Sequence, residues 1–233
     1  MFMNFDYDFC VFITTYNRPE KLNNLLNQII QNQKNFKIKI FVFDDGSDEK
    51  YNIPNFVKHV KFYPNMGKKR YWKIIDTTFK YLKNLNSKYF IYLPDDINLS
   101  DNFFEKSKST YESINDSKKI CLSLLTDKRV KSTNWTNFKT VDMGDVLKTQ
   151  WNDLCFISEK TFFSELDFKI DEIPLSRWIN NPSLSSGVGS QISLKLHNKG
   201  KSMYHTKLTL VLHGNHESKM NYEERKLNNI ITI

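Results

Sequence analysis

Short apolar runs alternate with amphipathic stretches through the first half of this sequence, and this pattern restricts the fold most. Runs of strand length occupy residues 9–15, 38–43, 57–63, 89–93 and 120–125. Two of the intervening stretches carry apolar residues at helical spacing: Leu22, Leu25, Leu26, Ile29 and Ile30 after Pro19, and Tyr71, Ile75, Phe79 and Leu82. Strands joined by helix-length connections pair in parallel. We therefore expect an α/β fold with a mostly parallel sheet and helices on both faces.

The second half of the sequence is less regular. Ser100 is expected to cap a helix that runs through Tyr111, whereas residues 128–153 are polar, basic and aromatic without a clear period. The patterns further on predict a strand at 154–158, a short helix with Phe162, Phe163 and Leu166, a loop at 180–189, a strand or helix at 192–196, a strand at 203–212, and a charged helix or arm from Glu217. Without an internal repeat or linker, we expect one domain over residues 1–233.

Composition and charge exclude several classes of protein. The chain has 233 residues, 39% of them hydrophobic, so it can bury a core without a metal or disulfide. Its net charge of +8 favours polyanionic partners, although a lysine-rich solubilising surface has the same charge. Cys10, Cys121 and Cys155 lie in apolar stretches, which indicates buried thiols in a reducing compartment. No apolar run has the roughly 18 residues of a membrane span, and residues 1–8 lack the basic start of a signal peptide, so we expect a cytoplasmic protein.

Polar clusters follow three of the expected strands: Thr15-Tyr16-Asn17-Arg18, Asp44-Asp45-Gly46-Ser47 and Pro94-Asp95-Asp96. Parallel sheets bind ligands beyond the carboxyl ends of their strands. One Asp-Gly turn alone is ordinary turn chemistry, but a second acidic pair needs a cation or hydrogen bonds to relieve its repulsion. Carboxylate oxygens suit Mg²⁺ or Mn²⁺, which bridge proteins to substrate phosphates.

In order and spacing, these clusters together with Asn65-Met66-Gly67 resemble a GT-A glycosyltransferase of the family 2 type, over residues 9–105. The resemblance implies a Rossmann-like fold, a nucleotide-sugar donor such as a UDP-sugar, and Mn²⁺ or Mg²⁺. It further implies a donor half at residues 1–115 and an acceptor half, with a C-terminal arm, at residues 116–233.

The same resemblance assigns roles to individual residues. Thr15, Tyr16 and Arg18 match the first donor-binding loop, and Asp45 matches the carboxylate that accepts from the base or ribose. Asp96 matches the last Asp of the metal-binding Asp-x-Asp motif, whose first Asp is replaced here by Pro94. Asp95 then faces the ribose or sugar, and we count it among the catalytic residues.

Basic and histidine residues elsewhere complete the expected donor site. Arg70, at the end of Gly67-Lys68-Lys69-Arg70 ahead of a helix, is expected to grip the pyrophosphate; the alternative is a solvated helix start. In several GT-A enzymes a late His completes the metal sphere and a nearby Lys meets the diphosphate. His213 and Lys219 fit these two roles, although both also fit a structural role.

The catalytic base is the main departure from the family pattern. Inverting family 2 enzymes carry a Glu-Asp pair before a helix with Arg-Leu, but the matching stretch here, residues 187–191 ahead of Lys195-Leu196, has no acid. Inversion needs a base for the acceptor proton. Either another carboxylate serves, with Asp153 as the leading candidate, or the enzyme retains configuration; Asp153 also suits a cap at a strand start.

Residues 128–139 hold the cations Lys128, Arg129, Lys131 and Lys139 with no acid, interleaved with Trp135 and Phe138. Cations neutralise phosphates and aromatic rings stack on bases, as in nucleic-acid binding, but a sugar-stacking loop has the same composition. Size and charge are similar to those of bacteriophage enzymes that glycosylate hydroxymethylated DNA bases. The preferred acceptor is therefore double-stranded DNA, in the host cytoplasm if the protein is viral, with Lys128, Arg129, Lys131 and Trp135 as acceptor-binding residues.

Two alternatives to this function remain, and the sequence argues against a third, a nucleotidyltransferase. The acceptor is instead a surface glycan or polysaccharide precursor, or the protein is a non-catalytic sugar-nucleotide or DNA-binding module, which Pro94 and the missing Glu-Asp pair favour. A nucleotidyltransferase is expected to show a glycine-rich loop after the first strand, which Thr15-Tyr16-Asn17-Arg18 is not.

Overall fold

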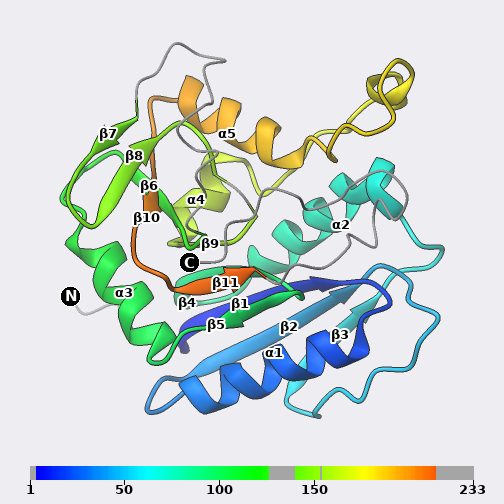
Figure 1. The fold of residues 1–233 in the computed structure, drawn as a ribbon, viewed down its shortest axis with the longest axis horizontal. Coiled ribbons are helices and arrows are strands. Elements are labelled where there is room, and N and C mark those ends of the chain that lie inside the picture. The colour runs from blue at the N-terminus through cyan, green and yellow to red at the C-terminus, as the bar shows by residue number, and fades with distance from the viewer. Residues whose placement is uncertain (1–3, 126–139, 153, 214–233) are drawn as a thin grey trace.

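Four parallel strands build the amino-terminal half of the structure, a computed structural model that describes residues 4–125, 140–152 and 154–213 (Figure 1). They are β1 (Tyr7–Thr15), β2 (Ile38–Asp44), β3 (Val57–Lys61) and β4 (Ser87–Pro94), in the spatial order β3-β2-β1-β4. Thr15 lies opposite Asp44, and Thr14 lies opposite Pro94. The three polar clusters of the sequence therefore leave the sheet at one level and at one edge.

The sheet continues with mixed pairing through the second half of the chain. Beyond β4 follow β9 (Phe156–Ser158), β6 (Lys119–Ser123), β10 (Ser202–Thr206), β8 (Val146–Thr149) and β7 (Val141–Asp142). Among the described residues, four of the eight neighbouring pairs in this nine-stranded sheet are parallel, and the other four are antiparallel. A separate antiparallel pair joins β5 (Ile97–Leu99) to β11 (Val211–His213).

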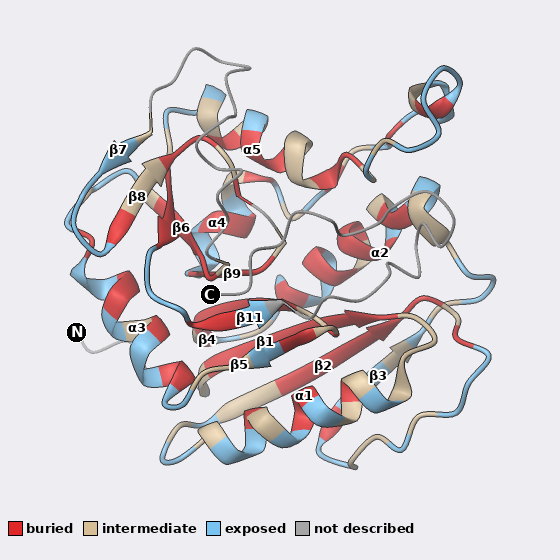
Figure 2. Cartoon of the chain, viewed as in Figure 1, coloured by how far each residue is buried: buried red, intermediate tan, exposed pale blue. Residues whose placement is uncertain are grey.

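Helices cover both faces of the sheet, which confirms the predicted fold class. The helices are α1 (Pro19–Asn32), α2 (Gly67–Leu82), α3 (Phe103–Ser113), α4 (Lys160–Glu165), the 3-10 helix η2 (Leu175–Trp178) and α5 (Val188–Asn198). Phe9, Val11 and Ile13 of β1 belong to the same buried cluster as the apolar residues of α1 and α3. Cys10 and Phe12, which point to the opposite face, belong to the cluster that includes residues of α2, α4 and α5. Figure 2 shows β1 and much of β2 buried between these two layers.

Aromatic side chains fill much of the second layer. Phe163 packs edge-on against Phe12 at 5.9 Å, Phe79 at 5.0 Å and Phe90 at 5.2 Å, measured between ring centroids. Each buried Phe contributes roughly 1.5–3 kcal/mol through burial alone. Cys10, Cys121 and Cys155 are buried free thiols, as predicted.

Several predicted boundaries are wrong. Ser100 does not cap α3, which begins after Asn102, because the Phe103 N–H is bound by the Asn32 side chain at 2.9 Å. The strand predicted at 57–63 ends at Lys61, and Gly67–Arg70 forms the first turn of α2 instead of preceding it. The stretch at 192–196 is helical, in α5.

Two further differences lie in the second half. The predicted strand 203–212 is two strands, β10 and β11, that belong to different sheets. The stretch predicted to be irregular contains β7 and β8. In the part of the chain that the structure describes, no helix is long and apolar enough to cross a membrane.

Candidate functional site

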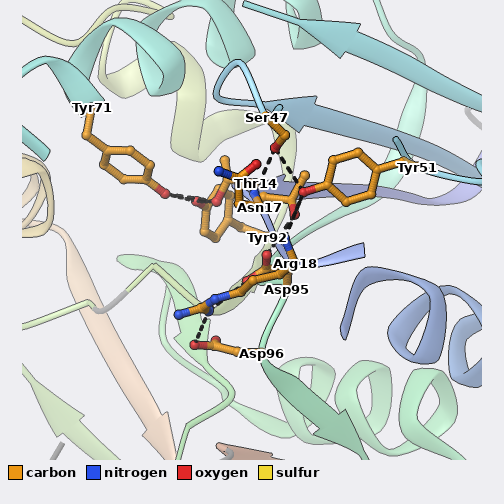
Figure 3. Close-up of polar contacts among 10 residues, drawn as sticks. Thr14, Asn17, Arg18, Ser47, Tyr51, Tyr71, Tyr92, Asp95 and Asp96 are labelled. Atoms are coloured by element: carbon orange, nitrogen blue, oxygen red, sulfur yellow. Dashed lines mark hydrogen bonds and ion pairs between the residues drawn. The ribbon is translucent and has the colours of Figure 1, made fainter. Parts of the chain in front are cut away.

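The carboxyl ends of β1, β2 and β4 bring three polar loops into contact (Figure 3). The Asp45 N–H donates to the Thr15 carbonyl at 2.9 Å, which continues the β1–β2 ladder into the loops. Asn17 adopts a left-handed φ of 48°, and its N–H donates to Ser47 Oγ at 2.8 Å. The turn after β1 is therefore fixed against the turn after β2.

Arg18 lies between the two carboxylates that follow β4. Its Nη1 is 3.1 Å from Asp95 Oδ1 and 2.7 Å from Asp96 Oδ2, and all three side chains are at most 13% exposed. The guanidinium supplies the cation that two adjacent carboxylates require. Burial lowers the pKa of Arg18, but the charges of Asp95 and Asp96 and their hydrogen bonds outweigh burial, so the net shift is upward. Arg18 is therefore a permanent cation at this edge of the sheet.

Asp95 is held from two sides. Its Oδ1 accepts from Arg18, and its Oδ2 accepts from the Thr15 hydroxyl at 2.7 Å. Burial raises the pKa of Asp95 to about 6, although the charge of Arg18 opposes the rise. The carboxylate is thus oriented before any ligand arrives.

Asp45 binds the start of helix α2. Its Oδ1 accepts the Met66 N–H at 2.6 Å and its Oδ2 accepts the Gly67 N–H at 2.9 Å, two of the N–H groups that a helix leaves without an internal partner. Burial raises the pKa of Asp45, and these two N–H groups act against the rise. The sequence reasoning assigned Asp45 to the donor alone, whereas the structure adds this capping contact.

Gly46 explains why Asn65-Met66-Gly67 accompanies the acidic turn. Its φ is +75°, and a Cβ there would lie 3.0 Å from the backbone of Asn65 and from the Phe62 carbonyl. Only glycine combines this left-handed conformation with so close an approach. The segment before α2 therefore packs directly on the turn after β2.

Asp44 is turned inward and has a structural role. It is fully buried, and its Oδ1 accepts from the Ser47 N–H at 2.9 Å and from the Ser47 hydroxyl at 2.5 Å. His59 Nε2 lies 3.4 Å from its Oδ2. No pattern in the sequence links position 59 to position 44.

Below the loops lies a cluster of three buried hydroxyl groups. Thr14 Oγ1 is 2.9 Å from the Tyr71 hydroxyl and 2.6 Å from the Tyr92 hydroxyl, and the two tyrosines bond each other. Three hydroxyls in a ring satisfy one another, since each donates once. The cluster ties β1, α2 and β4 together directly beneath the site.

The structure brings together Thr15, Arg18, Asp45, Asp95 and Asp96 among the predicted site residues. Tyr16 is partly buried in the same loop, and Arg70 is exposed in the first turn of α2. His213 pairs through its backbone with Ile97, the residue after Asp96. Asp153, Lys219 and the predicted acceptor residues Lys128, Arg129, Lys131 and Trp135 lie outside the described residues.

The stretch that lacks the Glu-Asp pair forms the start of α5. The Gln191 side chain accepts the Asp171 N–H at 2.9 Å and donates to the Asp171 carbonyl at 3.0 Å, so it holds a neighbouring loop. A Cβ at Gly189 would meet the Asn152 carbonyl at 3.4 Å and the Trp151 ring at 3.5 Å. The first turn of α5 therefore packs on the segment that leads to position 153.

The residues present fit a divalent metal as a partial site. No group of three or more His, Cys, Asp or Glu side chains within the described segments has metal-site geometry. Asp95 accepts on both of its oxygens, and Asp96 Oδ2 pairs with Arg18 at 2.7 Å, so Asp96 would share its carboxylate between Arg18 and a metal. One or two carboxylates are the usual protein share for Mg²⁺, since substrate phosphates and water supply the rest.

Comparison with known proteins agrees on the architecture. No protein-family model and no curated protein matches the sequence. Among solved structures, S. aureus TarS 1-349 has a TM-score of 0.56 at 14% identity and covers 89% of this chain and 60% of its own. Its complex with UDP-GlcNAc gives 0.57 at 12% identity, over 92% and 60% of the two chains. GalNAc-T7 with UDP, GalNAc and Mn²⁺ gives 0.55 at 15% identity, over 89% and 44%.

This chain thus spans less than two thirds of the length of these neighbours. At such low identity the likeness concerns the fold alone. The chain has the GT-A fold of glycosyltransferases.

Proposed function

We propose that this protein is a glycosyltransferase that moves a sugar from a UDP-sugar to an acceptor hydroxyl with the help of Mn²⁺ or Mg²⁺. The observation that carries the proposal is the cluster of Arg18, Asp95 and Asp96, held by Thr15 at the carboxyl edge of a GT-A sheet. The crystallised neighbours that contain UDP-GlcNAc, or UDP with Mn²⁺, support this choice of donor and metal.

Residues 1–115, together with His213 and Lys219 from the second half, bind the donor in this proposal. Asp45 accepts a hydrogen bond from the base or ribose, and Asp95 faces the ribose or the sugar. Arg70 and Lys219 contact the diphosphate, where their charges offset the phosphates. A metal bound by Asp96 and His213 would stabilise the negative charge of the leaving diphosphate.

Residues 116–233 bind the acceptor. Asp153 accepts the proton of the acceptor hydroxyl if the reaction inverts the anomeric centre. The packing of α5 on Trp151 and Asn152 supports this placement, because it brings the segment that leads to Asp153 beneath the helix where family 2 enzymes carry their acidic pair.

The direct test is donor turnover. Purified protein is incubated with radiolabelled UDP-glucose, UDP-GlcNAc or UDP-GalNAc and Mn²⁺, and release of free sugar or UDP is followed. We expect slow donor hydrolysis that Asp96→Ala abolishes. Tight UDP binding without any turnover would instead favour the non-catalytic module. Pro94 and the lack of an acid in the first turn of α5 are the features that favour this alternative.

The proposed acceptor is a hydroxymethylated base in bacteriophage DNA. The support is the composition of residues 128–139, where Lys128, Arg129, Lys131 and Lys139 would bind phosphates and Trp135 would stack near the base. Replacing Lys128, Arg129 and Lys131 together should flatten the salt dependence of DNA affinity by about two to three units.

A surface glycan or polysaccharide precursor as acceptor predicts a different outcome. DNA affinity would then depend only weakly on salt, and transfer would be lost mainly on Trp135→Ala through lost sugar stacking. Absence of DNA binding by the wild-type protein at low salt would exclude the DNA acceptor and leave the donor chemistry untouched.

A further inference from the structure

The hydroxyl of Tyr51 lies between two loops of the donor site, those that follow β1 and β2 (Figure 3). Tyr51 belongs to the connection between β2 and β3 and is partly buried, with its ring edge-on to His59. Its oxygen is 3.1 Å from Thr15 Oγ1 and 2.9 Å from Ser47 Oγ, and it accepts the Arg18 N–H at 3.0 Å. One oxygen therefore touches the turn after β1 at two points and the turn after β2 at a third.

Counting protons gives this network a direction. Thr15 gives its hydroxyl proton to Asp95, and Ser47 gives its own to Asp44, so each hydroxyl is left only with acceptor capacity. Tyr51 has a single proton to donate. Ser47 Oγ already accepts the Asn17 N–H at 2.8 Å, whereas Thr15 Oγ1 has no other donor within the described residues. Thr15 Oγ1 therefore has more acceptor capacity left than Ser47 Oγ, and a Tyr51 proton placed on it gives a chain of donors that runs from Tyr51 through Thr15 to Asp95.

Both partners of Asp95 depend on Tyr51 in this arrangement. Thr15 receives a hydrogen bond on its hydroxyl, which polarises that hydroxyl toward Asp95. Arg18 is bound through its backbone N–H, at the residue just before helix α1, and this fixes the point from which the guanidinium reaches Asp95 and Asp96.

A second set of bonds makes the two turns move as one unit. Asn17 donates its N–H to Ser47, and its side-chain oxygen accepts the Asp48 N–H at 2.9 Å. Asn17 holds a left-handed conformation, which asparagine tolerates better than most residues. Tyr51, three residues after Asp48, adds its hydrogen bonds to Thr15, Arg18 and Ser47 to this set.

We propose that Tyr51 is a positioning residue for the donor: it orients Thr15 and Arg18, and through them the carboxylate of Asp95. This inference rests on the proposed function, because it assigns Tyr51 to the same donor site. It assigns no contact between Tyr51 and the reacting atoms.

The test is a double-mutant cycle on donor affinity. Tyr51→Phe, Thr15→Val and the double variant are compared with the wild type for UDP-sugar binding by calorimetry and for KM and kcat of donor hydrolysis. We expect Tyr51→Phe to weaken donor affinity about five- to tenfold, the cost of one or two hydrogen bonds, with KM affected more than kcat. Because Tyr51 acts through Thr15, the double variant should bind the donor more tightly than the product of the two single effects predicts.

Two further variants separate positioning from general stability. Thr15→Ser keeps the hydroxyl and should restore most of the affinity that Thr15→Val loses. Tyr204→Phe removes another tyrosine hydroxyl that donates to a carboxylate, Asp116 at 2.5 Å, in the second half of the chain, and should leave donor affinity unchanged.

Each outcome decides the inference. Suppose that the wild type binds the donor. Unchanged donor affinity in Tyr51→Phe, or strictly additive effects of the two single substitutions, then overturns the role of Tyr51 and leaves the proposed function intact. Loss of the native circular dichroism spectrum in Tyr51→Phe also overturns it, since Tyr51 would then serve folding. If the wild type binds no nucleotide, the proposed function fails and this inference fails with it.

Discussion

Replacing Asp45 separates the folding role of this residue from its proposed donor role. Asp45 is 4% exposed, and each of its two oxygens binds one N–H at the start of α2. Asp45→Ala removes both acceptors and leaves the N–H groups of Met66 and Gly67 without them. Asp45→Asn keeps one acceptor but places an amide N–H against the other backbone N–H.

The size of the folding effect follows from two opposing contributions. Two hydrogen bonds to a charged acceptor are worth about 3–6 kcal/mol together. Burial of the carboxylate opposes this gain, because it raises the pKa of Asp45 despite the two N–H groups. A capping acid replaced by alanine costs about 0.5–2 kcal/mol in other helices. We therefore expect Asp45→Ala to lower the free energy of unfolding by about 2 kcal/mol, well within the roughly 5–15 kcal/mol of a typical domain.

We expect Asp45→Ala to weaken UDP binding by more than its loss of folding stability can explain. At 25 °C Asp45→Ala should remain folded and yet bind UDP at least about tenfold more weakly, or about 1.4 kcal/mol. Urea unfolding followed by circular dichroism measures the first quantity, and calorimetry with UDP measures the second.

Asp76 provides the matched control. It lies on α2, the helix whose start Asp45 binds, is 9% exposed, and accepts a backbone N–H, that of Ile170, at 3.0 Å. Asp76→Ala removes the acceptor of the Ile170 N–H and should lose stability of comparable size while it keeps full UDP affinity. Unchanged UDP binding in a folded Asp45→Ala protein would refute the donor role, and equal loss of UDP binding in Asp76→Ala would show that the effect is indirect.

Three further predictions concern the metal, a buried turn and acid stability. EDTA should abolish sugar transfer and Mn²⁺ should restore it, whereas full activity in EDTA, or in Asp96→Ala, would contradict the metal role; an active His213→Ala protein would remove His213 alone. Gly46→Ala should lower the free energy of unfolding by about 1–3 kcal/mol, because the φ of +75° and the backbone 3.0 Å from the new Cβ both oppose a side chain. An unchanged midpoint of urea unfolding would show that the turn tolerates a side chain at this position. Burial raises the pKa of Asp116, but hydrogen bonds from Tyr204 and Lys148 outweigh burial and hold the pKa well below its usual range. The ionised carboxylate therefore stabilises the fold above about pH 4, and this stabilisation is lost as the pH falls further. Asp116→Asn should thus be about 1 kcal/mol less stable than the wild type at pH 7, with a difference that narrows below pH 4; a difference independent of pH would argue against ionisation as its source.

The amino-terminal half of the fold is predictable from sequence because its strands are continuous apolar runs. β1, β2 and β4 are buried on both faces, so their composition marks them directly. β7 and β8 carry no such signal, since they have two and four residues and half-exposed or exposed positions. The alternating residues from 203 to 212 hide the break between β10 and β11, because apolar alternation continues through the turn that separates two sheets.

The sequence predicts which loops form the candidate site, but it does not predict the side-chain partners within the site. Parallel strands end at one edge, so Thr15, Asp45 and Asp96 had to come together once the strands were assigned. Side-chain partners within that edge follow no sequence spacing. Tyr51 lies in a loop without periodicity, and its bond to Thr15 spans 36 residues. The bond between Arg18 and both acids likewise depends on three-dimensional register.

One measurement tests the central claim of a nucleotide-sugar site most directly: calorimetric titration of the wild-type protein with UDP and UDP-GlcNAc, in Mn²⁺ and in EDTA, beside Asp96→Ala. The account predicts saturable binding at one site per chain in Mn²⁺, and weaker binding both in EDTA and in Asp96→Ala. Absence of nucleotide binding by folded wild-type protein in Mn²⁺ would contradict it.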